Sequence, residues 1–210
     1  MRQIRKGQPP PSLIRHQAAR FATYDNYPEK DDLRASLVQE QRGLCCFCLT
    51  RIEPNGQSMK IAHWRPQTVQ PQDQLSYHNL LGACRGGEGH PHDDQHCDTR
   101  QGNRELSRNP AEPNHHIEDL LSYRGDGTIW STDAQFGFEI AELLNLNSKW
   151  LQNQRKAVLS GFFLELGKRS LSRTRLEDLL SRWHGDETVG PLPEYCMVVA
   201  FWLRKRLARA

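Results

Sequence analysis

Four cysteines in the first half of the chain constrain its fold more than any other feature of the sequence. Cys45 and Cys48 form a C-x2-C pair, and Cys84 and Cys97 follow 36 and 49 residues after Cys48. Four thiolates suit the tetrahedral coordination of zinc, and a closed four-sulfur site is structural rather than catalytic. The spacing therefore predicts a structural zinc site formed by Cys45, Cys48, Cys84 and Cys97.

The second cysteine pair is open, with twelve residues between its members, so alternatives to a pure four-sulfur site stay open. His96, or His90 and His92, could replace one thiolate. A set of buried free cysteines is the simplest alternative, because a free cysteine packs like a small apolar side chain. Cys46 and Cys196 are interpreted as non-ligands, the second because it lies in an apolar stretch.

Composition and apolar patterning favour a soluble, cytoplasmic protein. The chain has 210 residues, of which 37% are hydrophobic, enough for a buried core. Its first residues are basic but no apolar stretch follows them, and the longest apolar run, residues 195–203, is too short to span a bilayer. In a reducing compartment, six cysteines favour metal binding over disulfides.

Basic residues gather toward the two ends of the chain, although the net charge is only +3. Residues 1–20 contain five basic residues and no acid, residues 151–182 contain seven against three acids, and the last ten contain four. A basic surface spread in this way suits a polyanion such as nucleic acid. A solvated helical surface is an equally weighted alternative.

Turn signals and apolar spacing predict an α+β fold. We expect an extended arm over residues 1–28 and a helix over 29–42, which Gly43 ends. A hairpin should follow, with strands over 51–53 and 59–63 on either side of Pro54-Asn55-Gly56.

The rest of the chain divides into a metal module and a mainly helical region. A short helix is expected over residues 77–84, then a loop over 85–96 and a helix start near Cys97. Beyond these, two short strands should flank Asp126-Gly127, and helices should continue from Phe138. The expected units are residues 1–43 (arm and helix), 44–112 (metal module) and 113–210 (helical region).

The segment between the two cysteine pairs contains the candidate catalytic residues. His63 ends the predicted strand, and Asn79 lies on the predicted helix that leads to Cys84. A histidine at a strand end with an asparagine facing it is a candidate general base and its orienting partner. A lone histidine is more often an ordinary polar residue, and the place of His63 between metal-type cysteine pairs favours the catalytic interpretation.

The order of these motifs resembles the cysteine-bearing HNH (ββα-metal) endonucleases. It comprises the C-x2-C pair, His-x-x-Pro at His63, Asn-Leu-Leu from Asn79 and finally Cys97. Further segments resemble the HNH subunit of Septu-type and retron-linked anti-phage defence systems. These segments are residues 2–7, 60–67, 79–84, 96–99, 126–129 and 144–147.

The resemblance implies metal-dependent hydrolysis of nucleic-acid phosphodiester bonds, with a zinc-bound β-hairpin and helix gripping one divalent metal. His63 would be the general base that activates water, and Asn79 would hold its ring in the working orientation. Asp98, directly after the last cysteine, would ligate a catalytic Mg²⁺ or Mn²⁺. Asp98 is equally well explained as a helix cap.

The resemblance also implies partners. The substrate would be DNA, or RNA such as tRNA, and an SMC- or ABC-like ATPase would join the complex. In the retron version a reverse transcriptase and its DNA–RNA hybrid would be present too. The sequence contains no G-x-x-x-x-G-K-[ST] motif, so nucleotide hydrolysis would come from the ATPase, which we expect to dock on residues 138–210.

Two positions depart from the family pattern. Ala62 stands where the family usually has a metal-ligating acid or histidine, and Gln101 stands where a lysine is common. Either Asp98 holds the metal with a group from the loop, or the activity of this copy is weakened. That loop group could be Asp93, Asp94 or His92. The alternative functions are a non-catalytic zinc module that binds nucleic acid or a partner protein, and a purely structural subunit.

Overall fold

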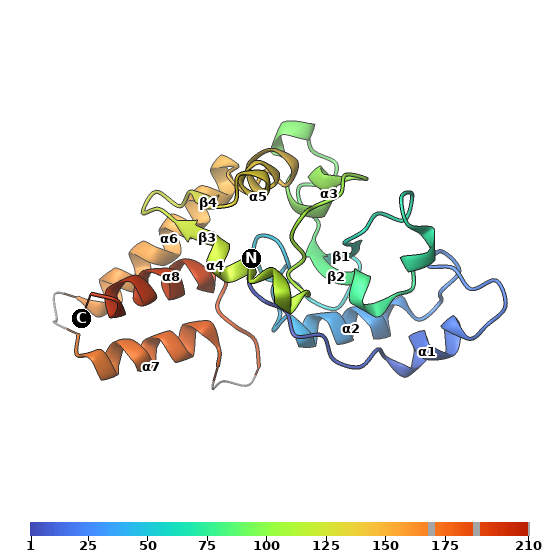
Figure 1. Ribbon diagram of the computed structural model, residues 1–210, viewed down its shortest axis with the longest axis horizontal. Coiled ribbons are helices and arrows are strands. Elements are labelled where there is room, and N and C mark those ends of the chain that lie inside the picture. The colour runs from blue at the N-terminus through green and yellow to red at the C-terminus, as the bar shows by residue number, and fades with distance from the viewer. Residues whose placement is uncertain (168–170, 187–189, 210) are drawn as a thin grey trace.

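The chain folds as a mixed α+β protein with two small antiparallel sheets. A computed structural model describes residues 1–167, 171–186 and 190–209 (Figure 1). The helices are α1 (Pro11–Gln17), α2 (Lys30–Glu40), α3 (Cys97–Gln101), α4 (Ile117–Leu120), α5 (Ala134–Phe138), α6 (Lys149–Leu166), α7 (Arg173–His184) and α8 (Cys196–Leu207). Strand β1 (Met59–His63) pairs with β2 (Leu80–Cys84), and β3 (Leu121–Tyr123) pairs with β4 (Ile129–Ser131).

The molecule is elongated, with the β1–β2 sheet, α1 and α2 at one end and α6, α7 and α8 at the other (Figure 1). Helix α8 packs against both α6 and α7. Helix α8 also reaches residues 44–49, which contain Cys45 and Cys48 and are called the cysteine turn below. Met197 of α8 shares a buried cluster with Leu44 and Leu49 of this turn. The largest buried cluster includes residues on both sides of position 112, from Met1 to Leu203, so the arm, the metal module and the helical region share a core.

The predicted helix after the arm is confirmed as α2. Leu33 and Leu37, four residues apart, are both fully buried on its inner face. Gly43 ends the helix as expected, in the left-handed region at φ 75°, and its amide donates a 2.8 Å hydrogen bond to the carbonyl of Val38. This reversal brings the chain directly into the cysteine turn.

The predicted hairpin is confirmed in its second strand, residues 59–63, which is β1, but is wrong in its first strand, residues 51–53. Strand β1 pairs with residues 80–84, which we expected to be helical, and Arg51 forms only an isolated bridge with Leu44. All five residues of β2 are buried, so the alternation that distinguishes a half-exposed strand from a helix is absent. The helical part of the expected segment is limited to a short 3₁₀ turn over Tyr77–Asn79.

The N-terminal arm is not wholly extended as expected, and α4 is a second helix that was not predicted, whereas α3 begins at Cys97 as expected. The arm contains α1, where Pro11 takes the first helical position and its fixed φ favours the turn. The strands expected beside Asp126-Gly127 are β3 and β4, and helical structure begins at Ala134, slightly before Phe138.

Two of the basic residues lie in the interior rather than on the expected basic surface. The Lys6 side chain is only 2% exposed and forms a 3.0 Å ion pair with Glu40. Arg155 is also buried, and it donates hydrogen bonds of 2.6 Å to the carbonyls of Gly127 and Leu146. Both cations therefore hold segments of the fold together, and neither is available to a polyanion.

Candidate metal centre and catalytic residues

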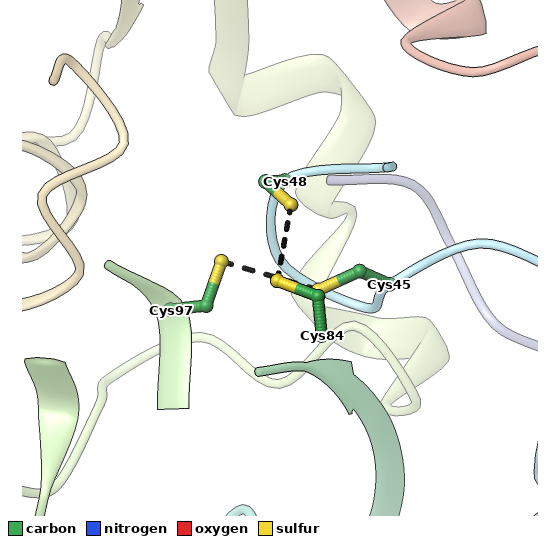
Figure 2. A group of neighbouring side chains, drawn as sticks. All are labelled: Cys45, Cys48, Cys84 and Cys97. Carbon is green, nitrogen blue, oxygen red and sulfur yellow. Dashed lines mark hydrogen bonds between the residues drawn. The ribbon is translucent and has the colours of Figure 1, made fainter. Parts of the chain in front are cut away.

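The first two cysteines lie in a tight turn between α2 and β1. The Cys45 amide donates to the Thr50 carbonyl at 2.9 Å, and the Cys45 carbonyl accepts from the Leu49 amide at 3.1 Å. Leu49 takes the left-handed conformation at φ 69° that closes the turn. These bonds point the Cys45 and Cys48 side chains toward the same point (Figure 2).

The other two cysteines come together through a glycine contact. Cys84 ends β2, and two residues later Gly86 accepts a 2.9 Å hydrogen bond from the His96 amide. A Cβ at Gly86 would lie 2.1 Å from the His96 carbonyl oxygen, and the residue has a φ of +58°, so only glycine fits. This close approach brings Cys97 beside Cys84.

Cys97 has a strained backbone at the start of α3. Its φ of 57° is left-handed, which costs an ordinary residue about 1 kcal/mol or more. The Cys97 amide donates to the Leu144 carbonyl at 2.9 Å, and Asn145 donates to the carbonyls of Asp93 and Gln95, both at 2.9 Å. The helical region thus holds this strained segment in place.

The four sulfur atoms converge on one buried point (Figure 2). All lie within 4.8 Å of one another, with Sγ–Sγ distances of 3.9 Å for Cys45–Cys97 and 3.7 Å for Cys48–Cys84. A tetrahedron of sulfurs about 2.3 Å from a zinc ion has edges of about 3.8 Å. The predicted set of four cysteines is therefore confirmed as a group that could hold a metal ion, and its donors and spacing fit zinc.

The electrostatics of the group favour a thiolate. Burial alone would raise the pKa of Cys45, but hydrogen bonds from the neighbouring thiols outweigh it and lower that pKa well below its usual value. Cys46 and Cys196 are outside the group, as expected.

The histidines considered as substitute ligands are not among the converging side chains. The Nδ1 atom of His96 lies 3.2 Å from the Cys97 sulfur, and its ring stacks on Trp150 with the ring centres 5.7 Å apart. His96 is therefore not one of the converging donors but contacts one of them, the Cys97 sulfur. His90 and His92 are exposed.

His63 is half-buried at the end of β1, with both ring nitrogens engaged. Its Nε2 lies 3.0 Å from the Gln74 carbonyl oxygen, and its Nδ1 lies 3.2 Å from the Gln67 side-chain nitrogen. Because a carbonyl only accepts, the ring proton is on Nε2 and the lone pair is on Nδ1. Burial lowers the pKa of His63, so at neutral pH the ring is uncharged and can accept a proton.

Asn79, which was expected to orient the His63 ring, forms its side-chain hydrogen bonds with other residues. Its side-chain oxygen accepts from the Arg65 amide at 2.7 Å, and its nitrogen donates to the carbonyls of Arg65 and Asp73, both at 3.1 Å. These three bonds close the base of the 64–79 loop, which carries Gln74. Asn79 thus positions the partner of the histidine rather than the histidine itself.

Asp98 is the second residue of α3, and its carboxylate faces β1 rather than capping the helix. It forms a 3.3 Å ion pair with the ammonium of Lys60. The same ammonium lies 3.7 Å from a Glu88 oxygen and 3.3 Å from the Thr99 hydroxyl. Burial raises the pKa of Asp98, and Lys60 opposes that shift.

The expected second metal does not fit these residues. Ala62 is buried and offers no donor, while the Asp93 side chain is 97% exposed and pairs with Arg100. Asp94 and His92 are exposed on the same loop. Among the described residues, the four cysteines are the only group of three or more metal-binding side chains that converge.

Sequence reasoning missed Lys60 and Gln67, although both lie beside His63 in the quoted motif. Strand alternation places Lys60 on the same face as Ala62, which was the available signal. The proximity of Tyr24, whose ring meets the His63 ring edge-on at 4.5 Å, had no sequence signal because it comes from the arm.

Comparison with known proteins finds no family model and no curated sequence that matches this chain. Of the helices in the described ranges, none has both the length and the apolar character needed to cross a membrane.

Proposed function

We propose that the protein is a zinc-stabilised nuclease of the HNH type, which hydrolyses phosphodiester bonds of nucleic acid. The observation that carries the proposal is the state of His63. It is a neutral histidine with its proton fixed on Nε2 by a backbone carbonyl and its lone pair on Nδ1. This is the arrangement that a general base needs.

The zinc part of the proposal rests on the cysteine geometry. Four buried thiols, spaced as zinc-bound sulfurs are, tie the turn after α2 to the end of β2 and the start of α3. Zinc would be structural here, since four sulfurs leave no open position for water or substrate.

In the proposed reaction, the Nδ1 atom of His63 takes a proton from water as the water attacks phosphorus. The P–O bond to the leaving nucleotide oxygen breaks, and that oxygen takes a proton from solvent. The Gln67 amide, which donates to Nδ1 in the free protein, must first give way to the water. The Gln74 carbonyl then stabilises the imidazolium through the proton on Nε2. Mg²⁺ or Mn²⁺ would stabilise charge on the phosphate in related chemistry, but the residues near Asp98 do not form a site for it.

The test compares His63→Ala with His78→Ala, a matched control at an exposed histidine of the same loop. Cleavage of plasmid, single-stranded DNA and tRNA is measured with zinc content determined in parallel. We expect His63→Ala to lose about a hundredfold to ten-thousandfold in rate with unchanged zinc, and His78→Ala to retain activity. A His63→Ala protein that cuts at the parental rate would place the base elsewhere.

A second function, a zinc module that binds nucleic acid without cleaving it, is favoured by a specific observation. Ala62, where the resemblance would place a metal-binding acid, offers only a buried methyl group, and the Lys60 ammonium pairs with the Asp98 carboxylate. Under this alternative the parent protein binds the same nucleic acids but cuts none of them, and His63→Ala leaves the affinity unchanged.

The place of the protein in an anti-phage defence complex is also a proposal, supported by the sequence resemblance. The ATPase, and in a retron system the reverse transcriptase with its hybrid, would bind the helical region. Leu164 on α6 is 83% exposed and offers an apolar contact. We expect Leu164→Lys to weaken co-purification with the ATPase without loss of zinc, and unchanged complex formation would exclude this contact.

A further inference from the structure

A lysine occupies the place where a metal-dependent nuclease of this design would hold its divalent ion. The Lys60 ammonium lies between the carboxylates of Asp98 and Glu88, at 3.3 and 3.7 Å, and within 3.3 Å of the Thr99 hydroxyl. The Asp98 and Thr99 oxygens come from α3 and the Glu88 oxygen from the loop after β2, and all three surround the ammonium of Lys60 on β1. The group is partly enclosed, with 30% of the Lys60 side chain and 19% of the Asp98 side chain exposed.

We propose that Lys60 is the resident cation of this pocket and that it excludes Mg²⁺ and Mn²⁺ from Asp98. Two carboxylates and a hydroxyl are oxygen donors of the type that these ions prefer, with water completing the coordination. A divalent ion bound to Asp98 would lie beside a like-charged ammonium, and that repulsion opposes binding. This inference rests on the proposed function, because it concerns the site of the proposed nuclease. It makes a claim only about which cations that site binds.

The charges around the pocket support this assignment. Glu88 also pairs with Arg85, so its carboxylate already has one cationic partner besides Lys60. Asp98 has Lys60 as its ion-pair partner. Removal of the Lys60 charge therefore leaves Asp98 uncompensated, next to a second carboxylate and a hydroxyl, which turns the ion pair into a potential divalent-cation site.

The neighbouring position on the strand fits the same picture. Ala62 follows Lys60 by two residues, so the two side chains point to the same face of β1. That face presents an ammonium and a methyl group, whereas an acid at position 62 would add a further oxygen donor for a divalent cation. The loss of an acidic donor at position 62 and the presence of a cation at position 60 both act against metal binding.

The experiment measures Mn²⁺ binding by electron paramagnetic resonance on the full chain loaded with zinc, without nucleic acid. The variants are Lys60→Met, which removes the charge, and Lys60→Arg, which keeps it. Zinc content and circular dichroism confirm that each variant is folded, and Lys60→Gln replaces Lys60→Met if the latter does not fold. Zinc stays in place because thiolates prefer it to Mn²⁺.

We expect the parent and Lys60→Arg to bind no Mn²⁺ at millimolar concentration. Lys60→Met should bind one ion about tenfold tighter or more, and Asp98→Asn added to it should abolish that binding. Parental binding as tight as that of Lys60→Met would overturn the proposal, as would no binding by either protein. Because no cleavage is measured, these results are independent of whether His63 is a general base.

Discussion

A largely buried carboxylate that is not part of the four-cysteine group should control how stability depends on pH. Glu118 of α4 accepts hydrogen bonds from the Gln3 amide at 2.9 Å, from Arg204 of α8 at 3.0 Å and from His184 of α7 at 2.8 Å. The second ring nitrogen of His184 lies 2.6 Å from Asp186. Gln3, Glu118, His184 and Asp186 line a cleft of about 700 Å³, and the hydrogen bonds of the cluster join the N-terminal arm to the last two helices.

The magnitude of the effect follows from the pKa of Glu118. Burial would raise that pKa, but the hydrogen bonds from His184, Gln3 and Arg204 outweigh burial and lower it from 4.5 to about 2. At about 1.4 kcal/mol per pKa unit, the charged carboxylate contributes about 3 kcal/mol to the free energy of unfolding. This contribution is complete above pH 4.5, the unfolded value, and disappears as pH falls toward 2.

His184 acts in the opposite direction. Its hydrogen bond to Glu118 is the largest cause that raises its pKa above 6.5. The stabilisation by the charged imidazolium is therefore complete below pH 6.5 and disappears as pH rises through the folded pKa. Both contributions are present together between pH 4.5 and 6.5.

The test is urea unfolding of Glu118→Gln and the parent, with zinc present, at pH 6 and at pH 8.5. The variant should lose about 3 kcal/mol at pH 6 and less at pH 8.5, where the parent has lost its imidazolium. Glu177→Gln, which removes an exposed pair with Arg173, is the control and should change stability by less than about 0.5 kcal/mol. A Glu118→Gln loss that is equal at both pH values would refute the reasoning about His184.

Three further predictions concern the metal module. Cys48→Ser should reduce zinc stoichiometry and melting temperature together, because zinc binding is coupled to folding, and a full zinc load at the parental melting temperature would contradict this. Gln41→Ala should cost about 2–3 kcal/mol in urea unfolding, because the buried Gln41 amide bonds both the N–H and the carbonyl of Gly82; a loss below about 0.5 kcal/mol would argue against it. Ala62→Glu should destabilise by about 1–3 kcal/mol and gain no Mn²⁺ binding while Lys60 remains, since it buries a carboxylate beside that ammonium; Mn²⁺ binding by the single variant would contradict this.

The cysteine cluster could be predicted from the sequence because the ligand spacing and the thiol chemistry are local properties. The C-x2-C turn needs only Cys45, Cys48 and the reversal at Leu49. The closure onto Cys97 was less visible, since it depends on a left-handed cysteine held by Leu144, almost fifty residues later in the chain.

The strand partner of β1 could not be predicted by the same means. Pro54-Asn55-Gly56 is a strong local turn signal, but tertiary contacts decide which segment adds to the strand. Gly82 shows why β2 takes that place: the Gln41 side chain bonds its backbone, and Cys46 donates to its carbonyl at 3.0 Å. These partners come from the end of α2 and the cysteine turn, which no pattern within residues 77–84 reveals.

The same error explains why Asn79 was assigned the wrong partner. If residues 77–84 were helical, Asn79 could face His63 across the site. Because residues 80–84 form a strand and residues 77–79 a 3₁₀ turn before it, Asn79 lies next to Leu80, the register partner of His63, and its side chain bonds the loop between the strands.

The strand register also connects the metal centre to the candidate base. Cys84 is opposite Met59 at one end of the β1–β2 sheet, and His63 is opposite Leu80 at the other. A sheet of two strands is marginally stable unless other contacts hold it. The four cysteines hold the Cys84 end of the sheet, and Asn79 closes the loop at the His63 end. Loss of a metal ion from the cysteines should therefore free the Cys84 end of β2 first. It should disturb the Gln74–His63 contact only if the pairing of β1 with β2 shifts. A metal ion held by the four cysteines would therefore support the proposed base without touching it, so the proposed structural site and the proposed catalytic histidine are compatible within one small module.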